Sequence, residues 1–196
     1  MKLINTKIEG VYIIEPDVYG DNRGWFMETY NEEKFKEMGI DCKFVQDNMS
    51  YSALKGTLRG LHYQREPYSQ SKLVRCTKGC VIDVAVDIRK GSPTYGLWES
   101  IELSSENKKM FFMPHGIAHG FLTISDEVEF QYKCDNLYNK ASEGGIKYDD
   151  PTINVDWGSL LKGITPILSD KDKILPTLEE CNANFIYEVK KWKLTY

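Results

Sequence analysis

Short runs in which apolar and polar residues alternate dominate the chain, and clusters of turn residues separate them. Such runs occur at 11–19, 25–30, 43–52, 57–64, 71–77, 80–89, 98–104, 109–113, 119–125 and 128–135. Alternation with a period of two residues predicts β-strands, and about ten short strands with little helix are typical of a sandwich or barrel. No repeat or linker divides the sequence. We therefore predict an all-β fold with a single domain over residues 1–196.

Helix signals are confined to two places. Asn31 can cap a short helix that runs to Met38, with Gly39 just past its end. The charged stretch 169–180 can hold a second helix, whose length Pro176 limits. The tail after residue 181 is unusually aromatic, and we expect it to pack on its own domain or on a partner subunit. Its aromatic and large apolar members are Phe185, Ile186, Tyr187 and Trp192.

Three of the predicted strands carry one polar side chain on a face that is otherwise apolar. These side chains are His62, Lys72 and Tyr132, and alternation places His62 on the same face as Leu58. A lone inward Tyr or His is most often a structural core residue, whereas lysine is rarely buried without a partner. Taken together, the three side chains predict a polar cavity inside the barrel, because buried polar groups need water, partners or a ligand.

Composition excludes several function classes. The net charge of −4 and the pI near 5.5 argue against a nucleic-acid or membrane-surface binder, which usually carries a basic stripe. No apolar run is long enough to span a bilayer, and the first ten residues lack the apolar core of a signal peptide. The five cysteines follow no CxxC spacing, so we expect reduced thiols in a cytoplasmic protein.

The spacing between Gly56 and Gly79 resembles the first cupin motif, and Pro114-x-Gly-x-x-His119 resembles the second. In the usual first motif, two histidines and a glutamate bind a metal. Here His62 is kept, whereas Gln64 and Lys72 occupy the other ligand places. A protonated lysine has no lone pair for a metal. We therefore expect a cupin-type jelly roll with a few short helices and without a metal.

Several longer sequence words, in a fixed order over about two thirds of the chain, resemble the dTDP-4-dehydrorhamnose 3,5-epimerase family. Words of this length in order are far more specific than one short motif. The matching words are GDNRGWF (20–26), FVQDN (44–48), LRGLHYQ (58–64), KLVR (72–75), DVAVDIR (83–89), GSPT (91–94), AHGF (118–121) with Pro114, and YK (132–133), and the stretch 168–176 extends the match.

The resemblance implies epimerisation, without metal or cofactor, of dTDP-4-dehydro-6-deoxy-D-glucose at C3 and C5, the carbons that flank its ketone. It assigns His62 as the general base, Tyr132 as the proton donor on the opposite face, and Lys72 as the cation beside the enolate. The family aspartate that orients the base falls at Asp172, with Asp170 as a rival. A histidine suits the base role because its pKa of about 6.5 lies near working pH.

The resemblance also implies a nucleotide-sugar substrate and a homodimer. Arginines suit a diphosphate because they bind it in a bidentate manner, and Phe26 or Trp25 suits stacking on the base. The candidate substrate-binding residues are Arg23, Phe26, Glu28, Gln46, Asp47, Asn48, Arg59, His119, Glu143 and Lys171. Three alternatives stay open: an epimerase that inverts one carbon of a related 4-keto sugar, a metal-dependent cupin enzyme, and a non-catalytic nucleotide-sugar-binding module.

Overall fold

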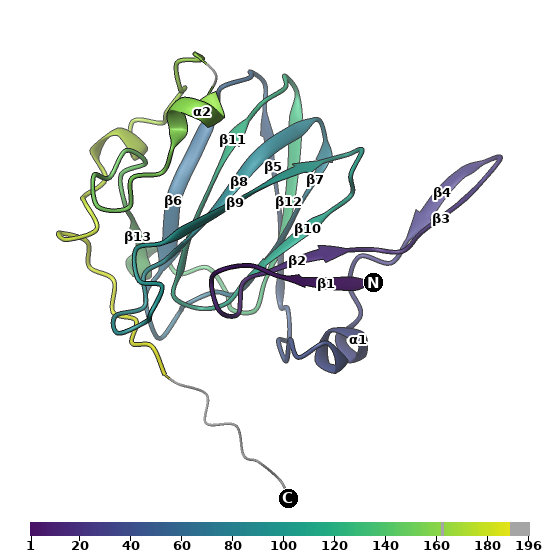
Figure 1. The fold of residues 1–196 in the computed structure, drawn as a ribbon, viewed down its shortest axis with the longest axis horizontal. Helices are drawn as coiled ribbons and strands as arrows, with labels where there is room; N and C mark the ends of the chain where they lie inside the picture. The colour runs from purple at the N-terminus through teal and green to yellow at the C-terminus, as the bar shows by residue number, and fades with distance from the viewer. Residues whose placement is uncertain (162, 189–196) are drawn as a thin grey trace, which may run out of the picture.

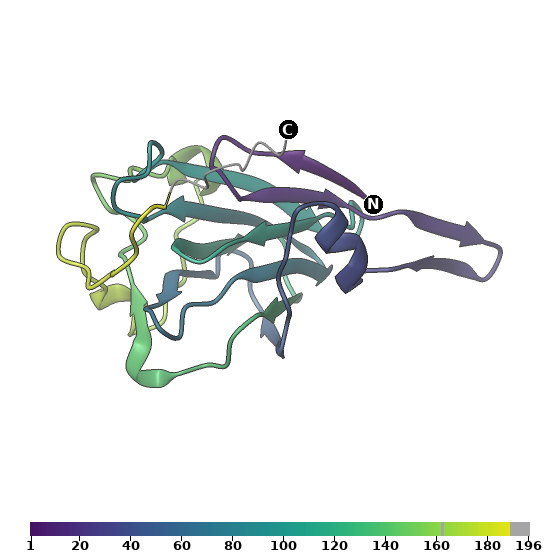
Figure 2. The same cartoon turned by 90° about the horizontal axis from the view of Figure 1, so that it is seen from below.

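The computed structural model describes residues 1–161 and 163–188, and its centre is a sandwich of two antiparallel sheets (Figures 1 and 2). The first sheet contains, in spatial order, β1 (Lys2–Asn5), β2 (Tyr12–Glu15), β10 (Met110–Met113), β7 (Lys72–Lys78), β12 (Val128–Cys134) and β5 (Gln46–Ser52). The second contains β13 (Glu143–Gly145), β6 (Leu58–Gln64), β11 (Ile117–Thr123), β8 (Cys80–Asp87) and β9 (Trp98–Ser104). The predicted cupin-type jelly roll is confirmed.

Alternation along the strands builds two apolar layers. Phe111 and Phe130 of the first sheet meet Phe121 of the second in the core between the sheets. The outer face of the second sheet is also covered, because Leu61 of β6 packs with Trp157 from the C-terminal part of the chain. With both of its faces covered, the second sheet is a rigid support for side chains that point into the sandwich.

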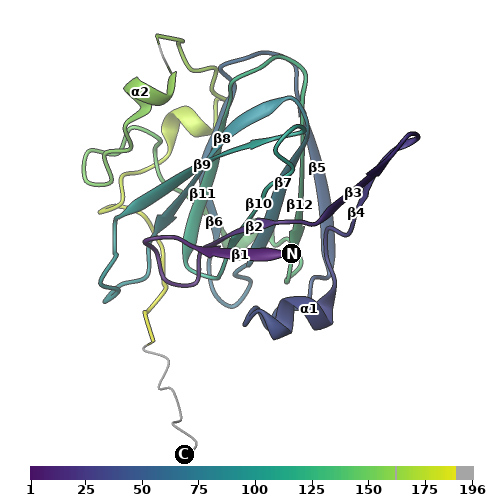
Figure 3. The same cartoon turned by 45° about the vertical axis from the view of Figure 1, so that its right-hand side comes forward.

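A two-stranded hairpin of β3 (Val18–Asp21) and β4 (Gly24–Met27) projects away from the sandwich (Figures 1 and 3). The sequence predicts one strand over 11–19, but β2 ends at Glu15, directly before Pro16, and the chain leaves the first sheet there. Proline cannot donate to a strand ladder, which explains the break. Tyr19, Trp25 and Phe26 of the hairpin are all exposed.

The first predicted helix is confirmed and the second is wrong. α1 (Glu32–Glu37) is capped by Asn31, whose side chain accepts a hydrogen bond of 3.1 Å from the backbone N–H of Lys34. The stretch 169–180 forms only the 3₁₀ turn η2 (Asp172–Ile174), after which the backbone at Leu175 is extended, as favoured before Pro176. Four further short elements were not predicted: β1, α2 (Trp157–Leu161), η1 (Lys140–Ser142) and β13.

The aromatic tail divides between buried and exposed side chains. Phe185 is buried against Tyr63, with ring centroids 5.9 Å apart, whereas Ile186 is exposed. This confirms packing on its own chain for Phe185, and Trp192 lies outside the described residues. Within the described residues, no helix is both long and apolar enough to cross a membrane.

Candidate active site

A cavity of about 460 Å³ opens into the sandwich between the two sheets. His62 on β6, Lys72 on β7, His119 on β11 and Tyr132 on β12 all line it. A second hollow of about 320 Å³ shares His62, Lys72 and Tyr132 with the first. The three side chains whose faces predicted a cavity therefore lie where two hollows meet.

A break in the alternation of β6 gives this strand two cavity residues. Arg59 and His62 both line the cavity, although a regular strand would point them to opposite faces. The pairing of β6 with β11 shifts register between these positions. Leu58 borders the same cavity as His62 and also packs in the outer apolar cluster. Gly60 makes the shift possible, because a Cβ there would lie 2.5 Å from the Cα of Gly120.

The chain after α2 returns to the start of β6 and brings an aspartate to His62. The backbone N–H of Leu58 donates to the carbonyl of Ile167 at 3.0 Å, which docks this segment beside the cavity. Asp172 Oδ1 then lies 2.6 Å from His62 Nε2. Burial raises the pKa of Asp172, but the hydrogen bond with His62 and its charge outweigh burial and hold this pKa below its usual range. Asp170 is fully exposed and pairs with Lys173, so the rival does not contact His62.

Lys72 and Tyr132 lie side by side within the cavity. The Lys72 ammonium is 6.0 Å from the centre of the Tyr132 ring. Burial lowers the pKa of Lys72, and the nearby acidic groups Cys134, Asp83 and Glu143 act against that shift. Burial also raises the pKa of Tyr132, so its phenol stays protonated at neutral pH. The pair therefore combines a cation with a proton donor.

Two further cations line the same cavity. Arg59 is held by Ser52 Oγ at 3.3 Å and by the carbonyl of Tyr51 at 3.1 Å. Lys171 pairs with Glu143 at the rim, where the second hollow begins. A cavity with three cationic side chains can bind an anionic ligand such as a diphosphate.

His119 forms part of the cavity wall rather than its mouth. Its Nε2 lies 3.0 Å from both carboxylate oxygens of Asp83, a fully buried residue of β8. Its ring stacks on Phe130 with centroids 6.1 Å apart. Burial lowers the pKa of His119, which favours a neutral imidazole despite the neighbouring carboxylate.

Comparison with known proteins agrees with this geometry. The model of the dTDP-4-dehydrorhamnose 3,5-epimerase family matches residues 5–180. The chain belongs to this family. The enzyme of that name from Shigella flexneri is 54% identical over 173 residues, which cover 88% of this chain and 93% of the relative. The corresponding enzyme from Methanothermobacter thermautotrophicus is 51% identical over 179 residues, 91% of this chain and 95% of the relative.

A solved relative gives the same result for the fold. It is the Legionella pneumophila dTDP-6-deoxy-D-glucose-3,5-epimerase in complex with dTDP-4-keto-L-rhamnose, which superposes with a TM-score of 0.90 at 46% identity. The match covers 96% of this chain and 99% of that chain. The jelly roll of this epimerase-family chain is therefore that of a structure that binds a nucleotide sugar.

Not every predicted binding residue reaches the cavity of this epimerase-family chain. Gln46 and Asn48 line the second hollow, but Asp47 points to the other face of β5 and pairs with Lys133 at 2.9 Å. Strand alternation explains this, and the expectation that Asp47 lies in the same site is not met. Glu28 is paired with Lys34 at 2.8 Å beside α1.

The two hairpin residues are also remote from the cavity within one protomer. Phe26 is 69% exposed, and Arg23 makes its ion pair with Asp21 of the same hairpin. Neither lines a hollow that His62 lines. Their place at the tip of a projecting hairpin means that they can reach a substrate only across a subunit interface or after a movement of the hairpin.

The residue in the second predicted ligand place of the cupin motif has a structural task. The Gln64 amide donates to the carbonyl of Tyr68 at 2.8 Å and accepts from the N–H of Asn139 at 2.6 Å. His62 is likewise taken by Asp172. In the part of the chain that the structure describes, no group of three His, Cys, Asp or Glu side chains is placed to hold a metal ion.

Sequence reasoning missed three residues at the site. Tyr138 lines the second hollow, and its hydroxyl lies 3.3 Å from Glu143. Ser50 lines the main cavity with a buried hydroxyl that has no protein partner. Asp83 lies beneath His119. Of these, only Asp83 has a sequence signal: an acid between Ile82 and Val84 in a strand that is apolar up to Asp87 at its end.

Proposed function

We propose that this chain inverts C3 and C5 of dTDP-4-dehydro-6-deoxy-D-glucose to give dTDP-4-dehydro-L-rhamnose. The observation that carries the proposal is the meeting of His62, Lys72 and Tyr132 at one cavity, with Asp172 2.6 Å behind His62. Membership of the family and the substrate named in the relatives support it.

The first step removes a proton from a carbon next to the ketone. Since Nε2 of His62 faces Asp172, that nitrogen carries the hydrogen and Nδ1 presents its lone pair to the cavity. The carboxylate fixes this tautomer and stabilises the imidazolium that forms, as in other histidine–aspartate pairs. Such a general base contributes about 10²- to 10⁴-fold to the rate.

The negative charge then moves to the ketone oxygen. The Lys72 ammonium stabilises it there, and a fixed donor of this kind is worth about 10²- to 10³-fold. Tyr132 returns a proton to the opposite face of the sugar, which completes the inversion. His62 afterwards releases its proton to water and Tyr132 regains one, so that the protons balance over each turnover. Because each step is a proton transfer, the proposed reaction uses no cofactor or metal.

The nucleotide part would lie along the cationic rim. Arg59 and Lys171 suit the diphosphate, and the second hollow offers the amides of Gln46 and Asn48 and the ring of Tyr138 to the nucleoside. A cytoplasmic location is part of the proposal, supported by five cysteines that are all free thiols.

We further propose a homodimer in which each hairpin completes the site of its partner. Arg23 and Phe26 are expected to bind substrate, yet they lie on a hairpin that projects from its own sandwich (Figures 1 and 3). The exposed aromatic side chains of this hairpin need cover. A second copy of the chain supplies both the cover and the missing site.

A mixing experiment tests this arrangement. His62→Ala and Arg23→Ala subunits are each nearly inactive alone, but a mixed dimer has one site with both native residues. If subunits exchange freely, an equal mixture regains about a quarter of the native sites in a twofold-symmetric dimer. The control is His62→Ala mixed with Lys72→Ala. Both residues line the cavity of their own subunit, so every site of the mixed dimer carries one of the two defects and no activity should return. This pair would regain activity only if Lys72 acted in the partner's site.

Product analysis tests the activity itself. The purified chain is treated with a chelator, incubated with the 4-keto sugar nucleotide, and the product is identified by NMR couplings of the sugar ring. Inversion at both C3 and C5 with undiminished turnover is the expected result. Inversion at one carbon would indicate the mono-epimerase, loss of turnover after chelation a metal-dependent cupin, and bound but unchanged substrate a binding module.

A further inference from the structure

Behind His119, a residue of the cavity wall, lies a buried carboxylate for which the proposed reaction has no role. Asp83 on β8 is 0% exposed. Among the described residues, its only side-chain hydrogen-bond partner is His119, whose Nε2 lies 3.0 Å from each oxygen. A buried carboxylate is costly unless it is paired and hydrogen-bonded, and one N–H shared by two oxygens is sparse compensation.

The position of the His119 ring shows what that single contact does. The ring stacks on Phe130 at 6.1 Å and lies 6.4 Å from Phe121, so its plane is fixed by packing. Nδ1 has no hydrogen bond within the described chain. Nδ1 is not a buried unpaired atom either, because in the described chain only Ser50 Oγ and Arg65 Nε are buried side-chain atoms without a hydrogen-bond partner. Nδ1 therefore faces the open cavity that His119 lines.

Asp83 also bears on the charge of Lys72. The acidic groups that interact with this ammonium are Cys134, Asp83 and Glu143. Glu143 is paired with Lys171, and burial raises the pKa of Cys134 to about 11, which leaves it a neutral thiol. Asp83 is thus the carboxylate that remains to balance Lys72. The other ionisable group facing His119 is His62, which has Asp172 as its own partner.

We propose that Asp83 is a positioning residue of the site, which holds His119 as the Nε2–H tautomer and places a buried negative charge behind the cavity wall that His119 and Lys72 share. The inference rests on the proposed epimerase function for its catalytic meaning. In this arrangement the Nδ1 lone pair of His119 accepts a hydrogen bond from a hydroxyl of the sugar. Lys72 remains available, as a full cation, for the oxygen on which the enolate charge develops.

Two buried aspartates of the same strand give a matched test. Asp83→Asn keeps the side chain's shape and an oxygen that can accept from His119, but it removes the negative charge. We expect kcat to fall about 100-fold, the loss typical of a weakened oxyanion donor, with little change in KM. Without the carboxylate, Lys72 loses its proton at lower pH, so the alkaline limb of the kcat profile moves to lower pH.

Asp87→Asn is the control, because Asp87 is equally buried but its side chain bonds to Arg89, Ser92 and Thr94, none of which lines the cavity. It should cost stability while leaving kcat per folded molecule and the alkaline limb unchanged. Asp83→Asn with more than half of the native kcat and an unmoved limb would overturn the proposal. So would an equal movement of the limb in both variants.

A measurement on the unmodified protein tests the role of Asp83 even if Asp83→Asn does not fold or the proposed substrate is not the true one. The chain has only three histidines, so ¹⁵N-histidine NMR resolves each imidazole, and His119→Asn assigns the signal. Between about pH 6 and 8 we expect His119 to be neutral with the hydrogen on Nε2. A hydrogen on Nδ1, or a charged imidazolium in this range, refutes the positioning role without reference to turnover.

Discussion

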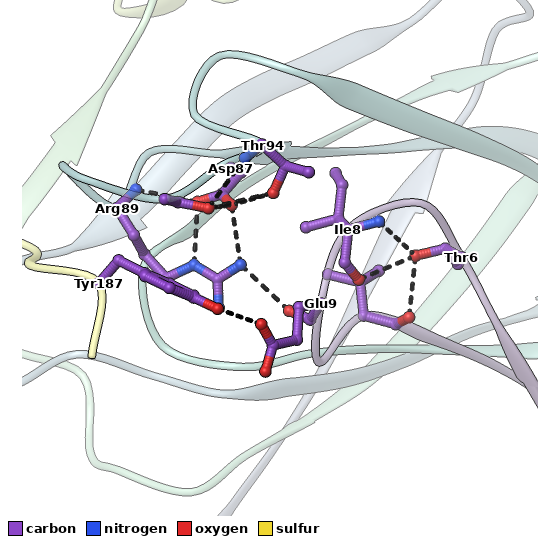
Figure 4. Close-up of polar contacts among 9 residues, drawn as sticks. Thr6, Ile8, Glu9, Asp87, Arg89, Thr94 and Tyr187 are labelled. Carbon is purple, nitrogen blue, oxygen red and sulfur yellow. Dashed lines mark hydrogen bonds and ion pairs between the residues drawn. The ribbon is translucent and has the colours of Figure 1, made fainter. Parts of the chain in front are cut away.

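Asp83 and Asp87 lie on the same strand and are both 0% exposed, yet they differ in how many hydrogen-bond donors surround the carboxylate. Asp87 accepts hydrogen bonds from the backbone and guanidinium of Arg89 and from the hydroxyls of Ser92 and Thr94 (Figure 4). Burial raises the pKa of Asp87, but these donors outweigh it and hold the pKa below its usual range. For Asp83, burial dominates and the pKa is raised.

The Asp87 cluster joins three parts of the chain. The Arg89 guanidinium, which is paired with Asp87, also donates to the carbonyl of Glu9 at 3.1 Å. It lies 5.4 Å from the centre of the Tyr187 ring. The Tyr187 hydroxyl in turn bonds to Glu9 (Figure 4). A carboxylate whose oxygens are all occupied fixes structure. Asp83, the carboxylate with few donors, bonds to His119, which lines the cavity, so its one side-chain contact is with a residue of the site.

The largest expected effect on the cavity side of this comparison comes from His62→Ala. Turnover should fall about 10³- to 10⁴-fold, because His119, the other imidazole in the cavity wall, is expected to bind a sugar hydroxyl and not to take a proton from carbon. Affinity for dTDP, measured by calorimetry, should stay near native because the predicted nucleotide contacts lie elsewhere. A variant that keeps a tenth of the native turnover would show that His62 is not the base.

On the structural side, Asp87→Asn should lower the free energy of unfolding by about 3 kcal/mol, since it leaves the Arg89 guanidinium partly buried without its charged partner. Denaturant titration measures the loss. Activity per folded molecule should not change. If stability is native and turnover is lost, the division between a structural and a functional aspartate is wrong.

Asp172→Asn sharpens the comparison within the cavity, with Asp170→Asn as its control. Turnover should fall about 100-fold for Asp172→Asn, because an amide cannot stabilise the imidazolium of His62 as a carboxylate does. Asp170 is fully exposed and contacts Lys173, so its variant should match the native enzyme in steady-state kinetics. Equal losses in the two variants would remove the case for a specific partner of His62.

Tyr132→Phe should separate exchange from inversion. His62 can still take and return a proton on its own face, so deuterium uptake continues, while formation of the inverted sugar falls about 30-fold or more for want of an acid on the other face. NMR in heavy water follows both at once. If inversion and exchange both remain native, another group donates the proton.

The smallest effect concerns a histidine outside the cavity. His115 bonds to Asp135 at 2.9 Å, and this contact raises the pKa of His115 despite its partial burial. Its stabilising effect is therefore complete below the unfolded value of about 6.5 and is lost as pH rises through the folded value. Compared with His115→Gln, the native chain should gain less than about 1 kcal/mol at pH 6 and nothing at pH 9. An advantage that grows with pH would contradict the sign.

The sequence predicted the parts of the fold that depend on local pattern. Alternation located the sandwich strands other than β1 and β13, and the Asn31 cap located α1. The prediction of a second helix was wrong because the charged pattern of 169–180 does not show where the helical backbone stops. Only the turn η2 forms, and Leu175 is already extended before Pro176. Alternation could not show that Arg59 and His62 both reach the cavity, because the shift at Gly60 depends on contact with Gly120, a residue distant in sequence.

The candidate site was predictable to a similar degree. Resemblance selected His62, Lys72, Tyr132 and Asp172, and the structure brings these four together. It could not show that Asp47 faces Lys133, since one residue of register decides the face of a strand side chain. Nor could it distinguish Asp83 from Asp87, because the number of donors around a carboxylate is a property of the fold.

Counting solvent deuterium in the product tests the central claim most directly. The native enzyme, chelator-treated and supplied with the 4-keto sugar nucleotide in heavy water, should give an inverted product labelled at both C3 and C5, and His62→Ala should give almost none. Inverted product without deuterium, or full labelling by His62→Ala, would contradict proton removal by His62 at this cavity.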